Sequence, residues 1–164
     1  MPNTKVYTGA DGSISLSAAQ GLEGEAAETV ITAFDTIAVG RVQNVRVEIH
    51  SDVKAYHEIG QRYATELRPG NITIRGTIGR ALLHGAMLRL LLGEAADGRP
   101  AASWAQPAFN ITLLVDNAGQ PGTRNTLTLH DVKLEAWSYT IPEDDFVAEA
   151  ITFQALYATV ADEG

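Results

Sequence analysis

The chain has 164 residues, 45% of them hydrophobic and 20% charged, which is the composition of a folded protein with a sizeable core and excludes a wholly disordered chain. The absence of cysteine excludes disulfide bonds, thiolate metal sites and a cysteine nucleophile. With 12 basic and 20 acidic residues the net charge is −8, which argues against a protein that grips nucleic acid through phosphate contacts.

The first half of the chain predicts two strands joined by a long loop. Residues 1–16 contain no apolar stretch of the kind found in secretory signal peptides, and residues 18–28, which are small and acidic, predict a loop. Residues 45–49 and 72–78 each alternate apolar with polar side chains, the pattern of a strand with one buried face. Ser51–Arg68, which separates them, is polar and mixed in charge, and a connection of 18 residues in so small a protein is usually functional.

A helix is predicted at about residues 80–92. Apolar residues recur there with the spacing of an amphipathic helix, and Gly93 follows as a C-terminal cap. We expect Leu83, Met87 and Leu90 to pack against the sheet. This segment is also the longest apolar stretch of the chain, and because it is interrupted by polar residues and too short to span a bilayer, no membrane insertion is expected.

The second half of the chain adds three predicted strands. Residues 109–115 and 151–157 alternate in the same way as the earlier strands. Residues 125–139 predict a longer strand whose apolar side chains change parity by one residue, which indicates a β-bulge near residues 130–131. Residues 116–122 are dense in turn formers and predict the tip of a hairpin.

Together these elements predict a mainly β fold, an antiparallel β-barrel or sandwich with one flanking helix and a long inter-strand loop. Val, Ile and Thr account for 37 of the 164 residues, and their branched Cβ atoms favour strands. No repeat and no linker divides the sequence, so we expect one domain over residues 1–164.

The sequence offers no pattern of catalytic, metal-binding or cofactor-binding residues. The four histidines lack the spacing of a zinc site, and neither a phosphate-binding loop nor a nucleophile elbow is present. Asp144 and Asp145 are a pair of carboxylates of the kind used in acid–base catalysis, but acids in a loop after a proline more often form a solvated surface. We therefore expect neither catalysis nor a cofactor.

Four segments resemble the tail tube proteins of tailed bacteriophages, those of contractile tails in particular. They are residues 7–14, residues 56–62 with 66–70, residues 76–81 with 85–93, and residues 141–146 with 151–156. Each is a strand or helix bounded by glycine or proline, and the resemblance lies in their combination and order over nearly the whole chain. It implies a β-barrel or sandwich subunit, six of which form a ring, with rings stacked into a hollow tube through which the genome passes.

The resemblance also implies partners and a location. The expected partners are further copies of the chain in stacked hexameric rings, the tail sheath, the baseplate or tail terminator, and the tape measure protein. DNA would pass through the tube without specific binding, and the protein would be made in the host bacterial cytoplasm and reside in the virion tail. The net negative charge suits such a conduit, because an acidic wall does not hold phosphates.

In this family the long loop reaches the neighbouring ring, and here it maps to Ser51–Arg68. Tyr56 and Ile59 are its expected apolar anchors. Three charged residues of the loop are available for pairing across an interface, namely Glu58, Arg62 and Arg68.

Strand parity predicts which residues face the channel. If the apolar side of each strand faces the subunit core, Arg46 and Glu48 face the lumen from one strand. Lys133 and Glu135 face it from another, and each pair cancels in charge. The expected net negative potential must then come from other acids, such as Asp131 and residues 143–145.

Three alternatives to the tube of a phage tail, contractile or flexible, remain open. The same fold would serve the tube of a bacterial contractile injection system, a type VI secretion system or a phage-derived bacteriocin. A ligand-binding β-barrel is a second alternative, which the aromatic content of 7% and the lack of a secretory signal disfavour. An enzyme using Asp144 and Asp145 would lack a nucleophile, a metal set and a histidine partner at a readable spacing.

Overall fold

The computed structural model describes residues 5–35, 37, 39–117, 119–120 and 122–163. Its α-helices are α1 (Gly21–Phe34) and α2 (Ala86–Leu92), and two short 3-10 helices are η1 (Gly9–Asp11) and η2 (Gly93–Ala96). Its strands are β1 (Gly12–Ala18), β2 (Val42–Tyr56), β3 (Glu66–Ala81), β4 (Phe109–Asp116), β5 (Arg124–Thr140), β6 (Ala148–Ala155) and β7 (Tyr157–Glu163). The predicted mainly antiparallel β fold is confirmed.

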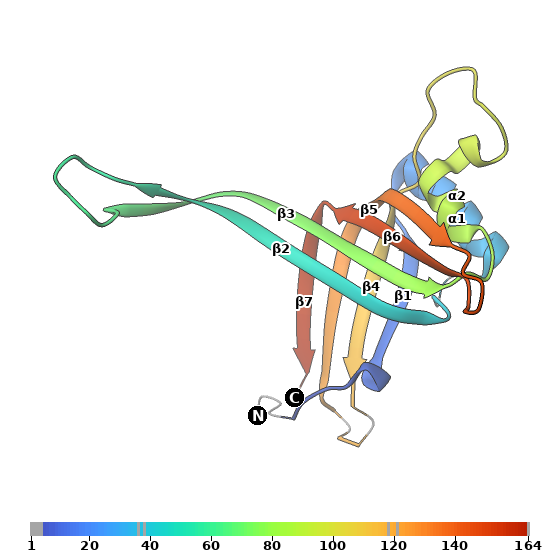
Figure 1. Cartoon of the computed structure of the whole chain (residues 1–164), viewed down its shortest axis with the longest axis horizontal. Coiled ribbons are helices and arrows are strands. Elements are labelled where there is room, and N and C mark those ends of the chain that lie inside the picture. Colours follow the sequence, from blue (N-terminus) through green and yellow to red (C-terminus); the bar gives the residue numbers. More distant parts are fainter. Residues whose placement is uncertain (1–4, 36, 38, 118, 121, 164) are drawn as a thin grey trace.

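The seven strands form one strongly curled sheet with two crossing halves (Figure 1). The first half, sheet A, has the order β1-β4-β5-β7, and the second, sheet B, has the order β2-β3-β6-β5. All strand pairs are antiparallel. Because β5 pairs with β4 and β7 through its first half and with β6 through its second, this one strand joins the two sheets.

A bulge lets β5 pass from sheet A into sheet B. Phe109 of β4 pairs with Val132, whereas Ile111, two residues on, pairs with Leu129, so β5 carries an extra residue there. Asp131 takes up that residue with a φ of 53°, and its backbone N–H donates to Asn110 Oδ1 at 3.1 Å. The bulge predicted near residues 130–131 is confirmed, and such bulges bend a strand.

The hydrophobic core lies between the inner faces of the two sheets and is closed at one end by both helices (Figure 1). Its buried members come from every layer and include Leu16, Ile31, Ile74, Ile78, Met87, Leu90, Phe109, Ile111, Leu129, Val132, Leu134, Ile151 and Phe153. Gly76 leaves the space that the ring of Phe153 occupies, because a Cβ there would lie 2.3 Å from Cζ of Phe153. The Phe153 ring therefore lies across β3 where any larger residue would collide with it.

The predicted helix is shorter than expected. It begins at Ala86, and the N–H of Ala86 donates to Nδ1 of His84 at 3.3 Å. Met87 and Leu90 are buried as predicted, whereas Leu83 is 53% exposed. The expectation for Leu83 was wrong because this residue lies in the connection that precedes the helix.

Two predicted loops are regular structure. Residues 18–28 were expected to be a loop, yet most of them belong to α1, whose buried face consists of Gly24, Ala27 and Ile31. A Cβ on Gly24 would lie 1.7 Å from the carbonyl oxygen of Ala19, so the close approach of helix and chain requires glycine. Small residues on the buried face give little apolar periodicity, which is why the sequence did not indicate a helix.

The long loop predicted at Ser51–Arg68 is also wrong. β2 continues to Tyr56 and β3 begins at Glu66, so the true connection covers residues 57–65 and the remainder is a β-hairpin. The strand predicted at residues 151–157 is in fact two strands that meet at Leu156. The N–H of Leu156 donates to the carbonyl of His130, and the chain turns there from sheet B into sheet A.

Candidate assembly and channel surfaces

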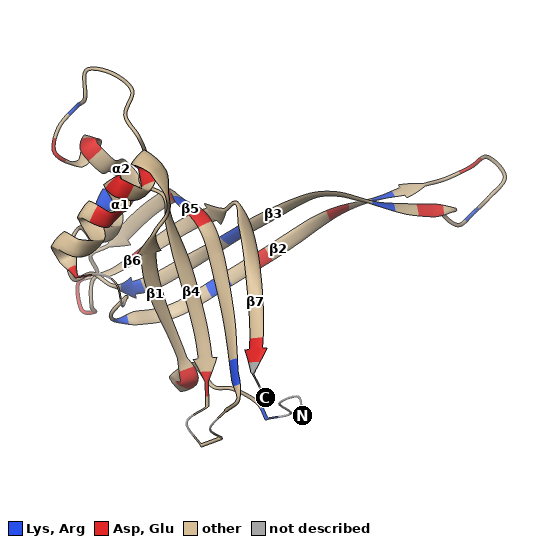
Figure 2. Ribbon diagram, turned by 180° about the vertical axis from the view of Figure 1, so that it is seen from behind, with Lys and Arg blue, Asp and Glu red and all other residues tan. Residues whose placement is uncertain are grey.

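The distal part of the β2–β3 hairpin, residues 50–73, projects from the body of the molecule and is called the arm here (Figures 1 and 2). The pairing of β3 with β6 begins at Ile74 and Ala155. Beyond that point, within the part of the chain that the structure describes, the two strands of the arm pair with each other and with no further strand. A two-stranded hairpin is at best marginally stable in water, so an arm of this length calls for a partner.

One face of the arm carries a line of exposed apolar side chains. The apolar stripe consists of Ile49 at the base of the arm and Val53, Leu67 and Ile72 within it, which are 52–67% exposed. Cross-strand pairing places Ser51 opposite Ile72, Val53 opposite Pro69 and Ala55 opposite Leu67. The stripe continues the side of β2 that contributes Val45 and Val47 to the core. It is therefore an extension of the core-facing surface with nothing of its own subunit over it.

A glycine and a shift in strand pairing keep the stripe on one face of the arm. The pairing shifts between Ser51 and Val53, where β3 carries one residue more than β2. At this shift a Cβ on Gly70 would lie 2.3 Å from the carbonyl oxygen of Asp52. Without the extra residue, the period of two would carry the apolar residues of β3 to the other face.

The predicted contact residues of this region are all exposed. Tyr56 ends β2, Ile59 and Arg62 lie in the connection at the tip, and Glu58 lies beside them. Arg68 pairs with Glu66 at 2.9 Å on the face opposite the stripe. Sequence reasoning thus located the projecting segment but missed the stripe. The signal was available, because the alternation of residues 45–49 continues through Val53 and Ala55.

The face of sheet B turned away from the core, called the polar face here, gathers the residues predicted to face a channel. One cross-strand row runs from Glu48 through Arg75 and Gln154 to Lys133. In the next row Arg46 lies opposite Thr77. A shallow hollow of about 360 Å³ is lined by Arg46, Glu48, Arg75, Thr77, Glu135 and Thr152, among others. The predicted channel-facing residues of β2 and β5 therefore contribute to one surface.

The charges of the polar face are mixed, and their partners lie both within the face and outside it. Arg46 and Glu48 approach each other at 4.0 Å, but Lys133 pairs with Glu23 of α1 at 3.0 Å. Glu135 accepts a hydrogen bond from Gln154 at 3.0 Å and does not pair with Lys133. Outside the arm, the described charged residues of this face are three basic and two acidic: Arg46, Arg75, Lys133, Glu48 and Glu135. An acid excess is therefore not built into this face.

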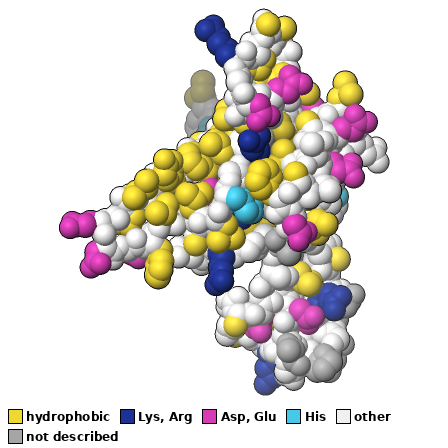
Figure 3. Space-filling model, turned by 90° about the vertical axis from the view of Figure 1, so that its right-hand side faces the viewer, with side chains coloured by type: hydrophobic (Ala, Val, Ile, Leu, Met, Phe, Trp, Pro, Cys, Tyr) yellow, Lys and Arg dark blue, Asp and Glu magenta, His cyan; other side chains and the backbone are white. Residues whose placement is uncertain are grey.

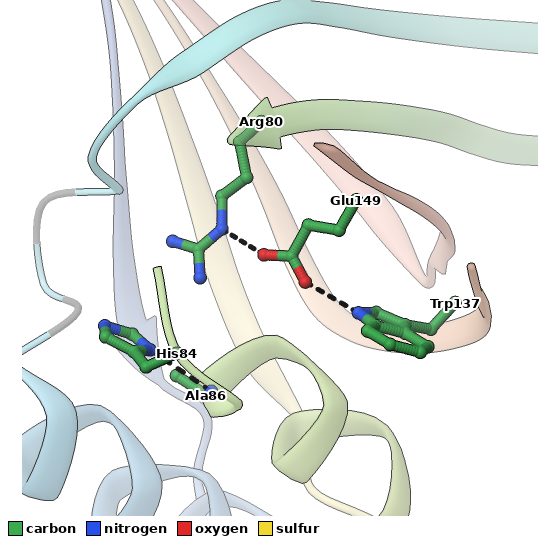
Figure 4. A network of polar contacts seen from close by, with 5 residues as sticks. All are labelled: Arg80, His84, Ala86, Trp137 and Glu149. Atoms are coloured by element: carbon green, nitrogen blue, oxygen red, sulfur yellow. Dashed lines mark hydrogen bonds and ion pairs between the residues drawn. The ribbon is translucent and has the colours of Figure 1, made fainter. Parts of the chain in front are cut away.

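A buried polar network lies at the end of sheet B that is opposite the arm (Figure 4). Arg80 of β3 and Glu149 of β6 form an ion pair, and Trp137 Nε1 of β5 donates to the second carboxylate oxygen of Glu149 at 2.7 Å. Beyond it, Tyr139, Ile141 and Phe146 are exposed apolar residues. Figure 3, which faces the end of the molecule away from the arm, shows hydrophobic side chains gathered in a band.

The aspartates and histidines considered for catalysis or metal binding lie in separate parts of the molecule. Asp144 and Asp145 are exposed in the connection from β5 to β6, where the Asp145 carboxylate accepts from the N–H of Phe146. His130 stacks on Tyr157 at 4.3 Å, whereas His84 lies before α2. Among the described residues no three His, Asp or Glu side chains gather as a metal site would require. In the same set of residues, no helix has the length and apolar character needed to cross a membrane.

No protein-family model matches this chain, and no curated protein matches it in sequence. Solved structures do match. A chain from the sheath–tube complex of an extracellular contractile injection system, PVC, aligns with a TM-score of 0.65 at 10% identity over 97% of this chain and 93% of that one. A chain from the tube-terminating cap of the anti-feeding prophage gives 0.66 at 10% identity over 99% and 95%. The SPP1 tail tube gives 0.60 at 12% identity over 96% and 80%.

The structural neighbours are thus tail tube proteins of a phage and of phage-like contractile injection systems, and this chain has their fold. The neighbours are structural proteins and not enzymes. At 10–12% identity the likeness concerns the fold, and function must be argued from the surfaces described above.

Proposed function

We propose that this chain is the subunit of a hollow tube, in which sheet B of each copy joins sheet B of the next to form the wall of a central channel. The observation that carries the proposal is the pair of sheet edges. Among the described residues, β2 has a strand partner on one side, and residues 133–140 of β5 pair with β6 alone. Long unprotected edges promote pairing with other chains, and closure into a barrel removes them.

The strand directions suit this closure. β2, β3, β6 and β5 run alternately up and down, so β5 is antiparallel to β2. When the β2 edge of one copy meets the β5 edge of its neighbour in a ring, the new pair is antiparallel as well. The ladder then continues from copy to copy without a change of pairing type.

Hexameric rings, stacked into a tube, are the proposed assembly. The neighbours support six-fold symmetry, since one is a gene transfer agent tail described with C6 symmetry (TM-score 0.55) and another belongs to a six-fold symmetrised baseplate (TM-score 0.63). Sheath, terminator or cap, and baseplate proteins are the proposed partners, because neighbours come from complexes bearing those names. A tape measure protein is proposed from the family resemblance, and the proposed location is a virion tail.

The polar face is the proposed channel wall, with Arg46, Glu48, Lys133 and Glu135 lining or bordering it. The apolar face of sheet B covers the core and continues into the apolar stripe of the arm. The polar face is therefore the one available to line a water-filled channel. If the tube belongs to a phage tail, DNA passes along this wall without specific binding. The mixed charges of the face form no continuous basic track for phosphates.

A tube of a bacterial contractile injection system is the second candidate. The observation that favours it is the mixed charge of the polar face, because the wall of a DNA conduit is expected to carry a net negative charge. The genes beside this one distinguish the candidates, since capsid and packaging genes accompany a virion.

Electron microscopy of the purified chain tests the proposal. Negatively stained samples across a concentration series are expected to show rings with six-fold averages, and stacked tubes at higher concentration. A matched sample lacking residues 50–73, joined by a short turn, should remain folded by circular dichroism and show neither rings nor tubes. Monodisperse monomers of the intact chain at every concentration contradict the function.

A further inference from the structure

The free edge of sheet B, residues 133–140 of β5, carries an aromatic pair on its core side. Trp137 is half-buried against the core, and Tyr139, which is 48% exposed, lies beside it with 4.8 Å between the ring centroids. Within the part of the chain that the structure describes, this stretch of β5 pairs with β6 alone. The pair therefore lies at the edge where a strand of a neighbouring copy is proposed to add, and aromatic residues often dominate the energy of an interface.

The orientation of Trp137 is fixed from inside the subunit. Its Nε1 donates to Glu149 at 2.7 Å, and Glu149 forms an ion pair with Arg80, so the network joins three adjacent strands (Figure 4). A buried ion pair is weak evidence for stability, because apolar residues of similar volume often serve equally well. What apolar residues do not supply is an acceptor for the indole N–H. The network therefore holds an edge residue in one orientation.

The tilt of strands in a closed barrel determines which part of a neighbouring β2 lies beside this edge. Barrel strands tilt by about 35–45° from the axis and lie about 4.8 Å apart, so the four strands of sheet B span about 19 Å. Successive copies in a ring are then displaced along the strands by about 13–19 Å, which is about four to six residues. Only an even displacement keeps the two faces of the joined sheet continuous.

The length of β2 decides the direction of this displacement. Within one copy Trp137 shares a cross-strand row with Val45. A displacement of four residues toward the start of β2 would bring Trp137 beside position 41, where β2 has not begun. The opposite displacement keeps residues 133–140 of β5 beside residues 46–52 of the neighbouring β2, so the whole free edge is paired.

The charges of the polar face select a displacement of four residues over six. With four, the carboxylate of Asp52 lies opposite Lys133, whose ammonium group pairs with Glu23 at 3.0 Å and has further donors. With six, Lys54 would lie opposite Lys133, and like charges directly opposite each other destabilise a sheet.

On the core side of the joined sheet, this register covers the aromatic pair with apolar side chains. Ile49 of the neighbouring β2 comes to lie beside Trp137, and Val47 comes to lie beside Tyr139. Ile49 is 52% exposed in the subunit, so the contact buries apolar surface on both copies. Aromatic residues paired with β-branched residues across a strand pair are among the combinations that stabilise sheets.

We propose that Trp137 and Tyr139 form the side-chain contact of the junction between copies, receiving Ile49 and Val47 of the next copy, and that Glu149 is the positioning residue for Trp137. The proposal rests on the proposed tube function and adds the register of its wall. Backbone hydrogen bonds alone would allow β2 to slide along the edge of β5, whereas the aromatic contact and the buried network admit one register.

Disulfide formation tests the register, because the natural chain has no cysteine to interfere. Two chains with tags of different size, one Tyr139→Cys and the other Val47→Cys, are mixed, assembled and oxidised with diamide. Directly opposite residues have Cα atoms about 4.5–5.5 Å apart, within reach of a disulfide, so a heterodimer on a denaturing gel is expected. The matched controls replace the second chain by Val45→Cys or Ile49→Cys, on the same face but two residues away, and little heterodimer is expected from them.

A second measurement tests the positioning role of Glu149. In the Trp104→Phe background the fluorescence reports on Trp137, which assembly is expected to shield from acrylamide. Arg80→Met with Glu149→Leu removes both buried charges and should remain folded by urea unfolding. Because its Trp137 lacks an acceptor, its near-ultraviolet circular dichroism should change, and rings should require a concentration about tenfold higher. Trp137→Phe, which removes only the donor side of the contact, should show the same rise.

The outcomes separate this proposal from the tube function. If intact chain forms rings but Tyr139→Cys links equally to all three partners, or to a control in place of Val47→Cys, the register is wrong and the tube function stands. If both Trp137→Phe and the folded double variant form rings at the natural concentration, Glu149 has no positioning role. If intact chain forms only monomers, both proposals fail. A Val47-specific disulfide in particles without ring symmetry supports the contact and contradicts the ring.

Discussion

Arg80 and Glu149 face each other directly across β3 and β6, and both are almost completely buried, with 1% and 2% of their surfaces exposed. Their ion pair is completed by Trp137, which donates to the same carboxylate. Among the described residues Nη2 of Arg80 has no hydrogen-bond partner, so the guanidinium is not fully satisfied. Burying two charges is costly, and the cost rises steeply when one of them loses its partner.

We predict that Glu149→Ala destabilises the unassembled subunit by about 3–5 kcal/mol, because it leaves Arg80 as an unpaired buried charge. The measurement is urea unfolding followed by circular dichroism. The double variant Arg80→Met with Glu149→Leu should recover most of that loss, since it removes both charges. Equal stability of Glu149→Ala and the natural chain would show that the pair is not buried as described.

Helix α2 provides a matched pair of leucines for testing the core. Leu90 is fully buried, and we expect Leu90→Ala to destabilise the subunit by about 2–5 kcal/mol through lost burial and the cavity left behind. Leu83→Ala removes the same atoms from an exposed position and should change the unfolding free energy little. Similar losses for the two variants, measured by thermal unfolding, would contradict the placement of the helix.

Gly76 should not tolerate a side chain. Gly76→Ala places a Cβ against the ring of Phe153, and overpacking of this kind costs about 1–3 kcal/mol. Gly98→Ala is the control, because nothing lies within 4 Å of a Cβ at that position. Addition of Phe153→Leu to Gly76→Ala should restore part of the stability. A Gly76→Ala chain that melts at the natural temperature would place Phe153 elsewhere.

The apolar stripe should matter for assembly and not for folding. Val53→Ser with Leu67→Ser changes residues that are more than half exposed in the subunit, so its unfolding free energy should change little. Sedimentation velocity should nevertheless show a marked loss of rings and tubes. The matched control is Lys54→Ser, on the opposite face of the same strand, which should assemble normally.

The tip of the arm is a separate prediction. We expect Tyr56→Ala with Ile59→Ala to leave the subunit folded and to reduce stacking of rings into tubes, because both side chains are exposed at the end of the projection. Microscopy should then show single rings in excess of tubes. Normal tubes from this variant would remove the tip from the inter-ring contact.

Sequence patterns predicted those parts of the fold in which one face is buried. The alternation of residues 72–78 and 109–115, and the change of parity near residues 130–131, correspond to β3, β4 and the bulge in β5. They were readable because a period of two and its interruption are direct consequences of strand geometry. α1 was missed because two of its three buried residues, Gly24 and Ala27, are small and leave little apolar periodicity in the sequence.

The candidate surfaces were harder to predict, because they depend on which residues the subunit leaves uncovered. The polar character of residues 51–68 indicated a loop, since both faces of the arm lie in water in the subunit and its charged face dominates the composition. The pairing of Lys133 with Glu23 joins residues 110 positions apart, and no local pattern reports such a contact. Strand parity did place Arg46 and Glu48 on the face that the structure assigns to solvent.

Sheet B contributes an even number of strands, and this decides how neighbouring copies would pair in a ring. In a ring joined edge to edge, an odd number of strands per copy would force a parallel pair at every junction. With four strands, the up-and-down order repeats after each copy, so every junction would be antiparallel whatever the number of copies. Strand direction therefore leaves the bore of the tube undetermined. In such a ring the bore would follow from the angle between neighbouring copies.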